Sequence, residues 1–185
     1  MLAASALVAL SMIELVAASD VATPTVYDAD PANCTVEPRT LDELERVLIL
    51  ATPIAPVERP QTGDSIDPTW GTGKDAIEII ETLFACLNAG DRMRTYALYT
   101  DAYLATILRP GDLPAVATPH PNDPDELTRI VAIALNALLD GRVLATVTLD
   151  PALIQVDKIF AFVLVPVDGA WKIDAVINEI DFSLP

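Results

Sequence analysis

The chain has 185 residues, of which 52% are hydrophobic and 21% charged, so it is long and apolar enough to bury a sizeable core. Basic side chains number 11 and acidic ones 27, which gives a formal net charge of −16. This composition excludes intrinsic disorder as the main state and disfavours binding to nucleic acid or to anionic lipid. One His and two Cys cannot assemble the usual soft-ligand metal sites, so we expect neither a metal nor a cofactor.

The first 19 residues form an apolar stretch that ends in Ala17-Ala18-Ser19. Such a stretch followed by small residues is typical of a secretory signal and its cleavage site. A retained membrane anchor and a buried helix of a cytosolic protein are the alternatives, because no basic residue precedes Arg39 and Glu14 interrupts the apolar run. We expect an extracytoplasmic or secreted protein that touches a membrane only through this segment, if the segment is kept.

Two cysteines, Cys34 and Cys86, are consistent with export. In an oxidising compartment they could form a disulfide that attaches the N-terminal arm to the main domain. The alternative is two unpaired thiols, with Cys86 buried in a helix. The spacing alone leaves both interpretations open.

Residues 20–69 are expected to form a proline-rich arm with one short helix. The helix spans 40–50, where Thr40 and Glu43 form a capping box. The stretches on either side of it, 20–38 and 52–68, contain several prolines and no periodic apolar pattern, so they are predicted to be loops. One structural hypothesis is that this arm mediates assembly at a cell surface.

The main domain is expected to span residues 70–185 and to begin with helices. Apolar residues at offsets of three and four predict a first helix over 72–88, capped by Thr72, and a second over 91–108 that breaks near Thr100. Asp123-Pro124 at its start and a similar apolar spacing predict a third helix over 124–138.

Beyond Gly141 the sequence changes to β-branched and apolar runs. These predict strands over 143–149, 159–167 and 170–180 in an antiparallel meander, with Asp168-Gly169 as a hairpin turn. The fold class is therefore α+β, with helices packed on a curved antiparallel sheet. Residues 160–165 are apolar on both faces, which predicts a cover on both sides and suggests a homodimer through the sheet.

Three segments together resemble the nuclear-transport-factor-2-like superfamily. They are the helix end Leu87-Asn88-Ala89-Gly90-Asp91, the aromatic helix 96–104, and the hairpin Asp168-Gly169-Ala170-Trp171-Lys172-Ile173. This superfamily includes SnoaL-like polyketide cyclases and ketosteroid isomerases. The resemblance covers roughly residues 70–185, and it implies a cone-shaped fold with a pocket at the mouth of the cone. Some members are enzymes and many others bind ligands without known chemistry.

Residues that could line such a pocket come from the second helix and the last strands. Tyr96, Tyr99 and Tyr103 are spaced to share a helix face, where they are either core aromatics or the lining of the cone. The candidates from the strands are Trp171, Asn178 and Glu179, and Asp181 is a further inward carboxylate to consider. Asp101 and His120 are expected to be surface residues.

Two functional hypotheses follow. The first is an exported, non-catalytic domain that binds a small apolar molecule or a protein partner, since no nucleophile motif or metal cluster is visible. Gly71-Thr72-Gly73 lacks the preceding strand of a dinucleotide site. The alternative is a small-molecule isomerase or cyclase in which a Tyr and a carboxylate act in the cone pocket.

Overall fold

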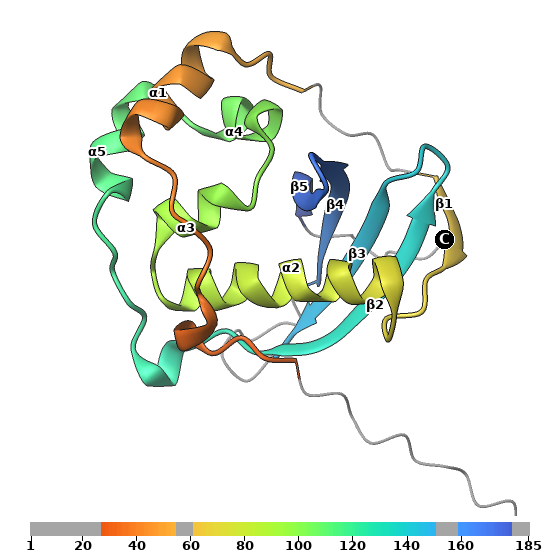
Figure 1. Cartoon of the computed structure of the whole chain (residues 1–185). Helices are drawn as coiled ribbons and strands as arrows, with labels where there is room; N and C mark the ends of the chain where they lie inside the picture. The colour runs from red at the N-terminus through yellow and green to blue at the C-terminus, as the bar shows by residue number, and fades with distance from the viewer. Residues whose placement is uncertain (1–26, 55–60, 151–158, 179–185) are drawn as a thin grey trace, which may run out of the picture.

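The computed structural model describes residues 27–54, 61–150 and 159–178. It is an α+β fold in which α2 lies across one face of an antiparallel sheet, while shorter helices gather at one end of α2 (Figure 1). The predicted leader or anchor, residues 1–19, lies outside the described residues. The curved shape of a cone remains a prediction.

The helices and strands follow one another from the arm to the final hairpin. The α-helices are α1 (Leu41–Leu50), α2 (Gly71–Asn88), α3 (Arg92–Ala97), α4 (Asp101–Ile107) and α5 (Leu113–Val116), and the short 3-10 helices are η1 (Pro31–Asn33), η2 (Pro110–Asp112) and η3 (Pro124–Glu126). The strands are β1 (Thr62–Ser65), β2 (Ile130–Leu138), β3 (Val143–Leu149), β4 (Ile159–Val167) and β5 (Ala170–Asn178).

The sheet confirms the predicted antiparallel meander. Its order is β1-β2-β3-β4-β5, and every neighbouring pair is antiparallel. Asp168 and Gly169 both have positive φ angles, 51° and 82°, as a two-residue hairpin turn of this type requires. The β4–β5 register shifts between Val163 and Leu164, so Asp174 occupies the extra position on β5.

The predicted third helix over 124–138 is wrong. Only η3 is helical there, and residues from Ile130 onward form β2, which pairs with β3. The apolar spacing that suggested a helix also fits a strand, because Ile133 and Leu135 point into the core at an offset of two. Pairing with β3 decides between the two patterns, since the ladder satisfies the backbone groups of the whole segment.

Two smaller expectations, one for the end of the arm and one for the start of the main domain, are also wrong. The loop over 52–68 contains β1, an exposed edge strand held by pairing with β2. Thr72 does not cap α2, which begins one residue earlier with Trp70 at the N-cap and no side-chain cap. Gly73 allows a close approach to the preceding loop, because a Cβ there would lie 1.8 Å from the carbonyl oxygen of Asp67.

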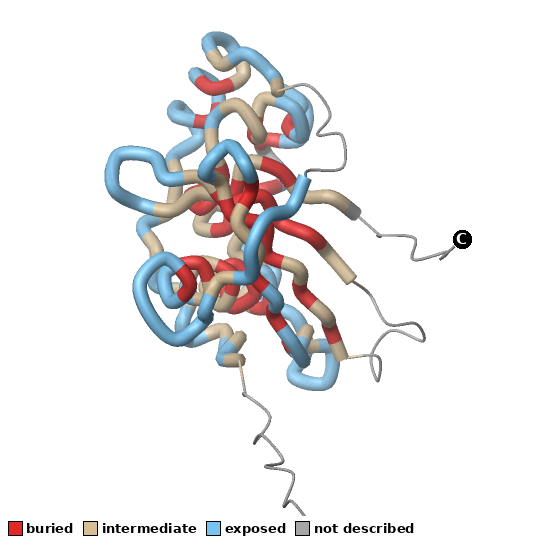
Figure 2. Tube along the Cα trace, turned by 90° about the vertical axis from the view of Figure 1, so that its right-hand side faces the viewer, coloured by how far each residue is buried: buried red, intermediate tan, exposed pale blue. Residues whose placement is uncertain are grey.

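The main core fills the space between the helices and the sheet (Figure 2). The side chains of Ile80, Leu83, Leu164 and Ile173 are fully buried in it, and Leu44 of the arm helix α1 joins the same core. The predicted capping box at the start of α1 is confirmed.

The opposite face of the sheet carries a second, smaller buried cluster. Ala161 and Val163 of β4 are only 1% and 0% exposed there, so the apolar pattern on both faces of the strand is confirmed. A single chain therefore already removes these side chains from water. The homodimer through the sheet remains a prediction.

The arm is bound to α2 and α3 at several points. Cys34 and Cys86 form the predicted disulfide, with 2.02 Å between their sulfur atoms. The guanidinium of Arg94 donates to the carbonyls of Cys34 and Val36, at 3.2 and 2.9 Å. The side-chain amide of Asn88 donates a hydrogen bond of 2.8 Å to the carbonyl of Ala29. Residues 27–39 therefore follow a fixed path over the helices.

Candidate functional site

The three predicted tyrosines lie together, although they do not share one continuous helix. Tyr96 is in α3, Tyr103 is in α4, and Tyr99 lies in the turn between them. The ring centroids of Tyr96 and Tyr99 are 6.3 Å apart, and those of Tyr99 and Tyr103 are 5.3 Å apart in an edge-to-face arrangement. Tyr99 is 8% exposed and belongs to the main core, while the other two rings pack against that core.

Burial keeps these phenols protonated. Desolvation raises the pKa of Tyr99 strongly, and the neighbouring phenols of Tyr103 and Tyr96 add to the rise. Desolvation also raises the pKa of Tyr96 and of Tyr103, although a hydrogen bond with the backbone of Val176 opposes the rise at Tyr103. A phenol in such surroundings is a neutral hydrogen-bond donor, not a base.

These raised pKa values predict a loss of stability at alkaline pH. Unfolded tyrosines release their protons near pH 10.0, whereas the folded phenols hold theirs to higher pH. Their contribution to stability is therefore complete below about pH 10 and is lost as the pH rises further. Urea midpoints on both sides of pH 10 should show this fall, and Tyr99→Phe should make it smaller. Tyrosinate absorbance that titrates fully near pH 10 in the folded protein would contradict it.

The predicted pairing of a tyrosine with an inward carboxylate has no support among the described residues. After burial, the negative charge of Asp112 also raises the pKa of Tyr96. Asp112 is exposed, however, and accepts a hydrogen bond from the amide of Arg109. Asp174 is occupied by the hydroxyl of Thr100 at 3.0 Å and by Arg142 at 3.3 Å. Neither is the desolvated acid that an isomerase site of this kind would need.

The turn between α3 and α4 is fixed by cations from two other elements. Arg39 of the arm donates to the carbonyls of Tyr96 and Tyr99, each at 3.1 Å, and forms a 2.7 Å ion pair with Asp101. Lys172 of β5 donates to the carbonyl of Ala97, and burial lowers the pKa of this amine. These cations satisfy carbonyls at the end of a helix, so their role here is structural.

Trp171 lines a surface hollow that is separate from the tyrosine rings. The hollow has a volume of about 510 Å³ and lies between the exposed side of α2, the arm and the β4–β5 turn. We call it the Trp171 hollow. It is lined by Thr35, Val36, Asp75, Glu78, Ile79, Thr82, Leu98, Gly169, Ala170 and Trp171.

The lining of the Trp171 hollow combines an aromatic ring, aliphatic side chains and negative charge. Asp75 and Glu78 are one turn apart on α2 and both are exposed. Neither forms an ion pair with a described residue, and no Lys or Arg lines the hollow. Sequence reasoning found Trp171 but missed the two carboxylates, whose spacing of three residues was the available signal.

A second hollow, of about 490 Å³, lies between α1 and α4. We call it the Arg46 hollow. Sequence reasoning did not find it, because its walls come from the arm and from the main domain. It is lined by Arg39, Glu43, Arg46, Val47, Leu50, Ala51, Thr52, Asp101 and Ala102.

Of the other candidate residues, Asp101 lines the Arg46 hollow and His120 lines neither hollow. Asn178 is the last residue of β5 and pairs with Phe160, while Glu179 and Asp181 lie outside the described residues. His120 is an exposed loop residue whose amide donates to the carbonyl of Gly90. Asp101 is the first residue of α4, and its side chain is 60% exposed, as expected for a surface carboxylate.

Three findings bear on location and on relatives. The disulfide is consistent with an extracytoplasmic location. Within residues 27–54, 61–150 and 159–178, no helix has the length and hydropathy needed to cross a membrane. Comparison with protein-family models, with curated proteins and with solved structures found no match.

Proposed function

We propose that this protein is an exported, non-catalytic binding domain of the nuclear-transport-factor-2-like kind. Its ligand site is the Trp171 hollow, and its ligand is a small molecule with an apolar body and a positively charged group. Because side chains pack the core between the helices and the sheet, a site on the surface is better supported than a pocket inside a cone. The disulfide supports export. The observation that carries the proposal is that Trp171, Asp75 and Glu78 line one hollow whose described lining contains no Lys or Arg.

The chemistry of the ligand follows from the lining. An aromatic ring attracts a cation at its face, and carboxylates add a Coulombic attraction that directs the charged end of the ligand. Ile79, Leu98 and Val36 provide an apolar surface for the remainder of the molecule. A volume of about 510 Å³ lies in the range of pockets that accept small molecules.

A tryptophan titration tests this site. The chain has two tryptophans, and Trp70 is 71% exposed, so Trp70→Phe leaves Trp171 as the only indole reporter. Adding phenethylamine should change the Trp171 emission saturably, while the neutral analogue 2-phenylethanol should bind at least roughly tenfold more weakly. In the same background, Asp75→Asn with Glu78→Gln should weaken amine binding by roughly tenfold or more, because the charge pairs are removed.

The matched control removes two other exposed acids, Asp125 and Glu126 of η3. Asp125→Asn with Glu126→Gln removes the same amount of negative charge and should leave the affinity unchanged. Equal losses in the two double variants would mean that only the overall negative field attracts the amine, and the site would be rejected. Export is tested separately by the intact mass of the protein recovered outside the cytoplasm, which should lack the apolar leader and carry the disulfide.

A further inference from the structure

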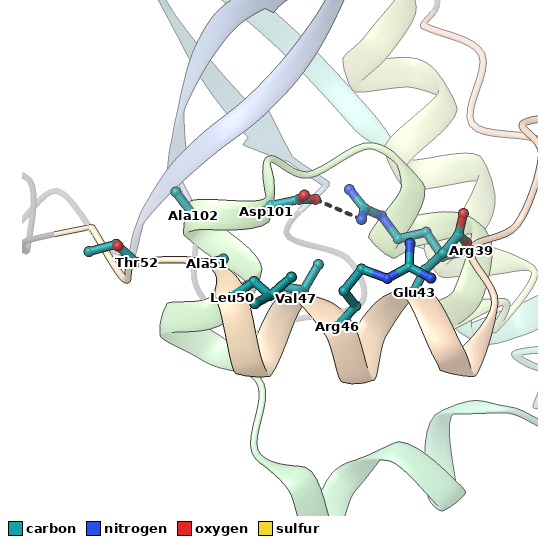
Figure 3. A pocket seen from close by; sticks show the side chains of 9 residues that line it. All are labelled: Arg39, Glu43, Arg46, Val47, Leu50, Ala51, Thr52, Asp101 and Ala102. Carbon is teal, nitrogen blue, oxygen red and sulfur yellow. Dashed lines mark ion pairs between the residues drawn. The ribbon is translucent and has the colours of Figure 1, made fainter.

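The Arg46 hollow has one apolar wall and one charged wall. Val47, Leu50 and Ala51 of the α1 end, together with Ala102 of α4, form the apolar wall. Leu50 is 72% exposed, so a large apolar side chain stands open to solvent at the rim. Figure 3 shows the charged side chains rising from α1 toward the ion pair between Arg39 and Asp101.

The two carboxylates that line this hollow, Asp101 and Glu43, both interact with other residues of the chain. Asp101 is paired with Arg39 at 2.7 Å. Glu43 belongs to the capping box of α1, where its carboxylate accepts from the amide of Thr40 at 2.7 Å and from the hydroxyl of Thr40 at 3.0 Å. Asp101 is thus neutralised by a cation, whereas Glu43 accepts through Oε2 alone and from neutral donors.

The two guanidinium groups of the hollow differ in how many of their donors are already used. Arg39 is committed to Asp101 and to two backbone carbonyls, and its side chain is only 18% exposed. Arg46 is exposed and forms no ion pair or hydrogen bond with any described residue. In Figure 3 its side chain rises from α1 on the side of the ion pair. The pKa of the Glu43 carboxyl is lowered by its hydrogen bonds with Thr40 and, less, by the charge of Arg46, so Arg46 has an acid nearby. Its guanidinium donors nevertheless hold no hydrogen bond to a described residue, which leaves them available to a ligand.

A planar guanidinium with free donors matches a carboxylate, which it can bind through two parallel hydrogen bonds. The net charge of −16 does not prevent this, because the field of exposed charges is screened over about 8 Å at physiological salt. The groups within that distance decide: two arginines and two carboxylates line the hollow, so their charges balance, and Arg46 keeps donors that no described residue uses. The apolar wall beside Arg46 fits the hydrocarbon part of the same ligand.

We propose that the Arg46 hollow binds a small organic acid, with Arg46 holding its carboxylate and the α1–α4 wall holding its apolar body. This site shares no lining residue with the Trp171 hollow. It therefore does not depend on the function proposed there, and the protein carries two surface sites of opposite charge preference.

Calorimetric titration of the full chain with phenylacetate tests the site, with the neutral isostere phenylacetamide as the reference ligand. Phenylacetate should bind at least roughly tenfold more tightly than the amide, and raising the salt from about 0.05 M to about 0.5 M should weaken it. Arg46→Gln should lower the affinity for phenylacetate by roughly tenfold or more and leave that for the amide unchanged. Arg46→Lys should restore part of the loss, because it keeps the charge without the fork.

Arg129→Gln is the matched control, because Arg129 is also exposed and does not line the hollow. It should bind phenylacetate like the unchanged protein. Thermal unfolding should show that all three variants are folded. Three results would overturn the proposal: no binding of phenylacetate at millimolar concentration, equal affinity for acid and amide, or equal losses in Arg46→Gln and Arg129→Gln. Competition between phenylacetate and phenethylamine would also overturn the independence of the two sites.

Discussion

Replacing Cys34 and Cys86 by alanine is expected to lower the free energy of unfolding by about 4 kcal/mol, because the disulfide closes a loop of 52 positions in the unfolded chain. For a chain of this size, the melting temperature should fall by roughly 10 °C. The folded contacts of the arm remain, since Arg94 and Asn88 hold it independently. The expected loss therefore comes from the freedom that the unfolded chain gains. Chemical denaturation of the oxidised protein and of the variant measures the difference.

The reduced form of the unchanged protein is the control for this result. It lacks the cross-link but keeps the side chain of Cys86, which is fully buried. If the cross-link is the cause, the reduced protein and the double variant should unfold at similar denaturant concentrations. A double variant within about 1 kcal/mol of the oxidised protein would show that the loop is already restricted in the unfolded state.

Asn88→Ala is expected to destabilise the fold by about 3 kcal/mol, since it leaves three partly buried backbone groups of Ala29 and Thr128 without this partner. The Asn88 side chain is 1% exposed. Its amide nitrogen donates to the carbonyls of Ala29 and Thr128, at 2.8 and 3.0 Å, and its oxygen accepts from the amide of Thr128 at 2.9 Å. One side chain thus joins the arm, the end of α2 and the segment that leads into β2. Urea unfolding followed by circular dichroism measures the loss.

Asn122→Ala provides a control of the same residue type. Asn122 is exposed, and its side chain makes one long hydrogen bond, 3.5 Å, to the carbonyl of Leu87. Its loss should cost no more than about 0.5 kcal/mol. Asn88→Asp gives a second comparison, because a carboxylate would face two carbonyls and its pKa should rise. Relative to Asn88→Ala, this variant should gain stability as the pH falls. Similar losses at positions 88 and 122 would contradict the role of Asn88.

The helices of the first half of the domain could be predicted because their signals are local. The capping box of Thr40 and Glu43, the apolar stripe of α2 and the break near Thr100 depend only on neighbours in sequence. The hairpin at Asp168-Gly169 is also local, since its two positive φ angles favour these residue types. The same kind of reasoning therefore identified the α+β class correctly.

The segments that were missed depend on pairing between distant parts of the chain. β1 contains Thr62, Gly63, Asp64 and Ser65, of which only Thr62 favours a strand, and it exists because β2 offers an edge. β2 itself is rich in alanine and leucine, which favour a helix until β3 is available to pair. No periodicity within these segments could show which partner would be present.

The candidate sites show the same division. Trp171 could be singled out from its hairpin, but its hollow needs the arm, α2 and the hairpin together. The Arg46 hollow needs α1 to pack beside α4, and sequence reasoning assigned α1 to a separate arm. Arg39 was likewise invisible as the residue that fixes the turn between α3 and α4, since its partners lie 57 and 60 positions away.

The positions of the two cysteines have a consequence for the order of events during biosynthesis. Both precede β2 in the chain, so both have left the ribosome before the strands that form most of the sheet are made. An oxidant could join the arm to α2 while the C-terminal half is still being synthesised. The later strands would then add one by one, each beside its predecessor, to an α2 helix that is already cross-linked to the arm.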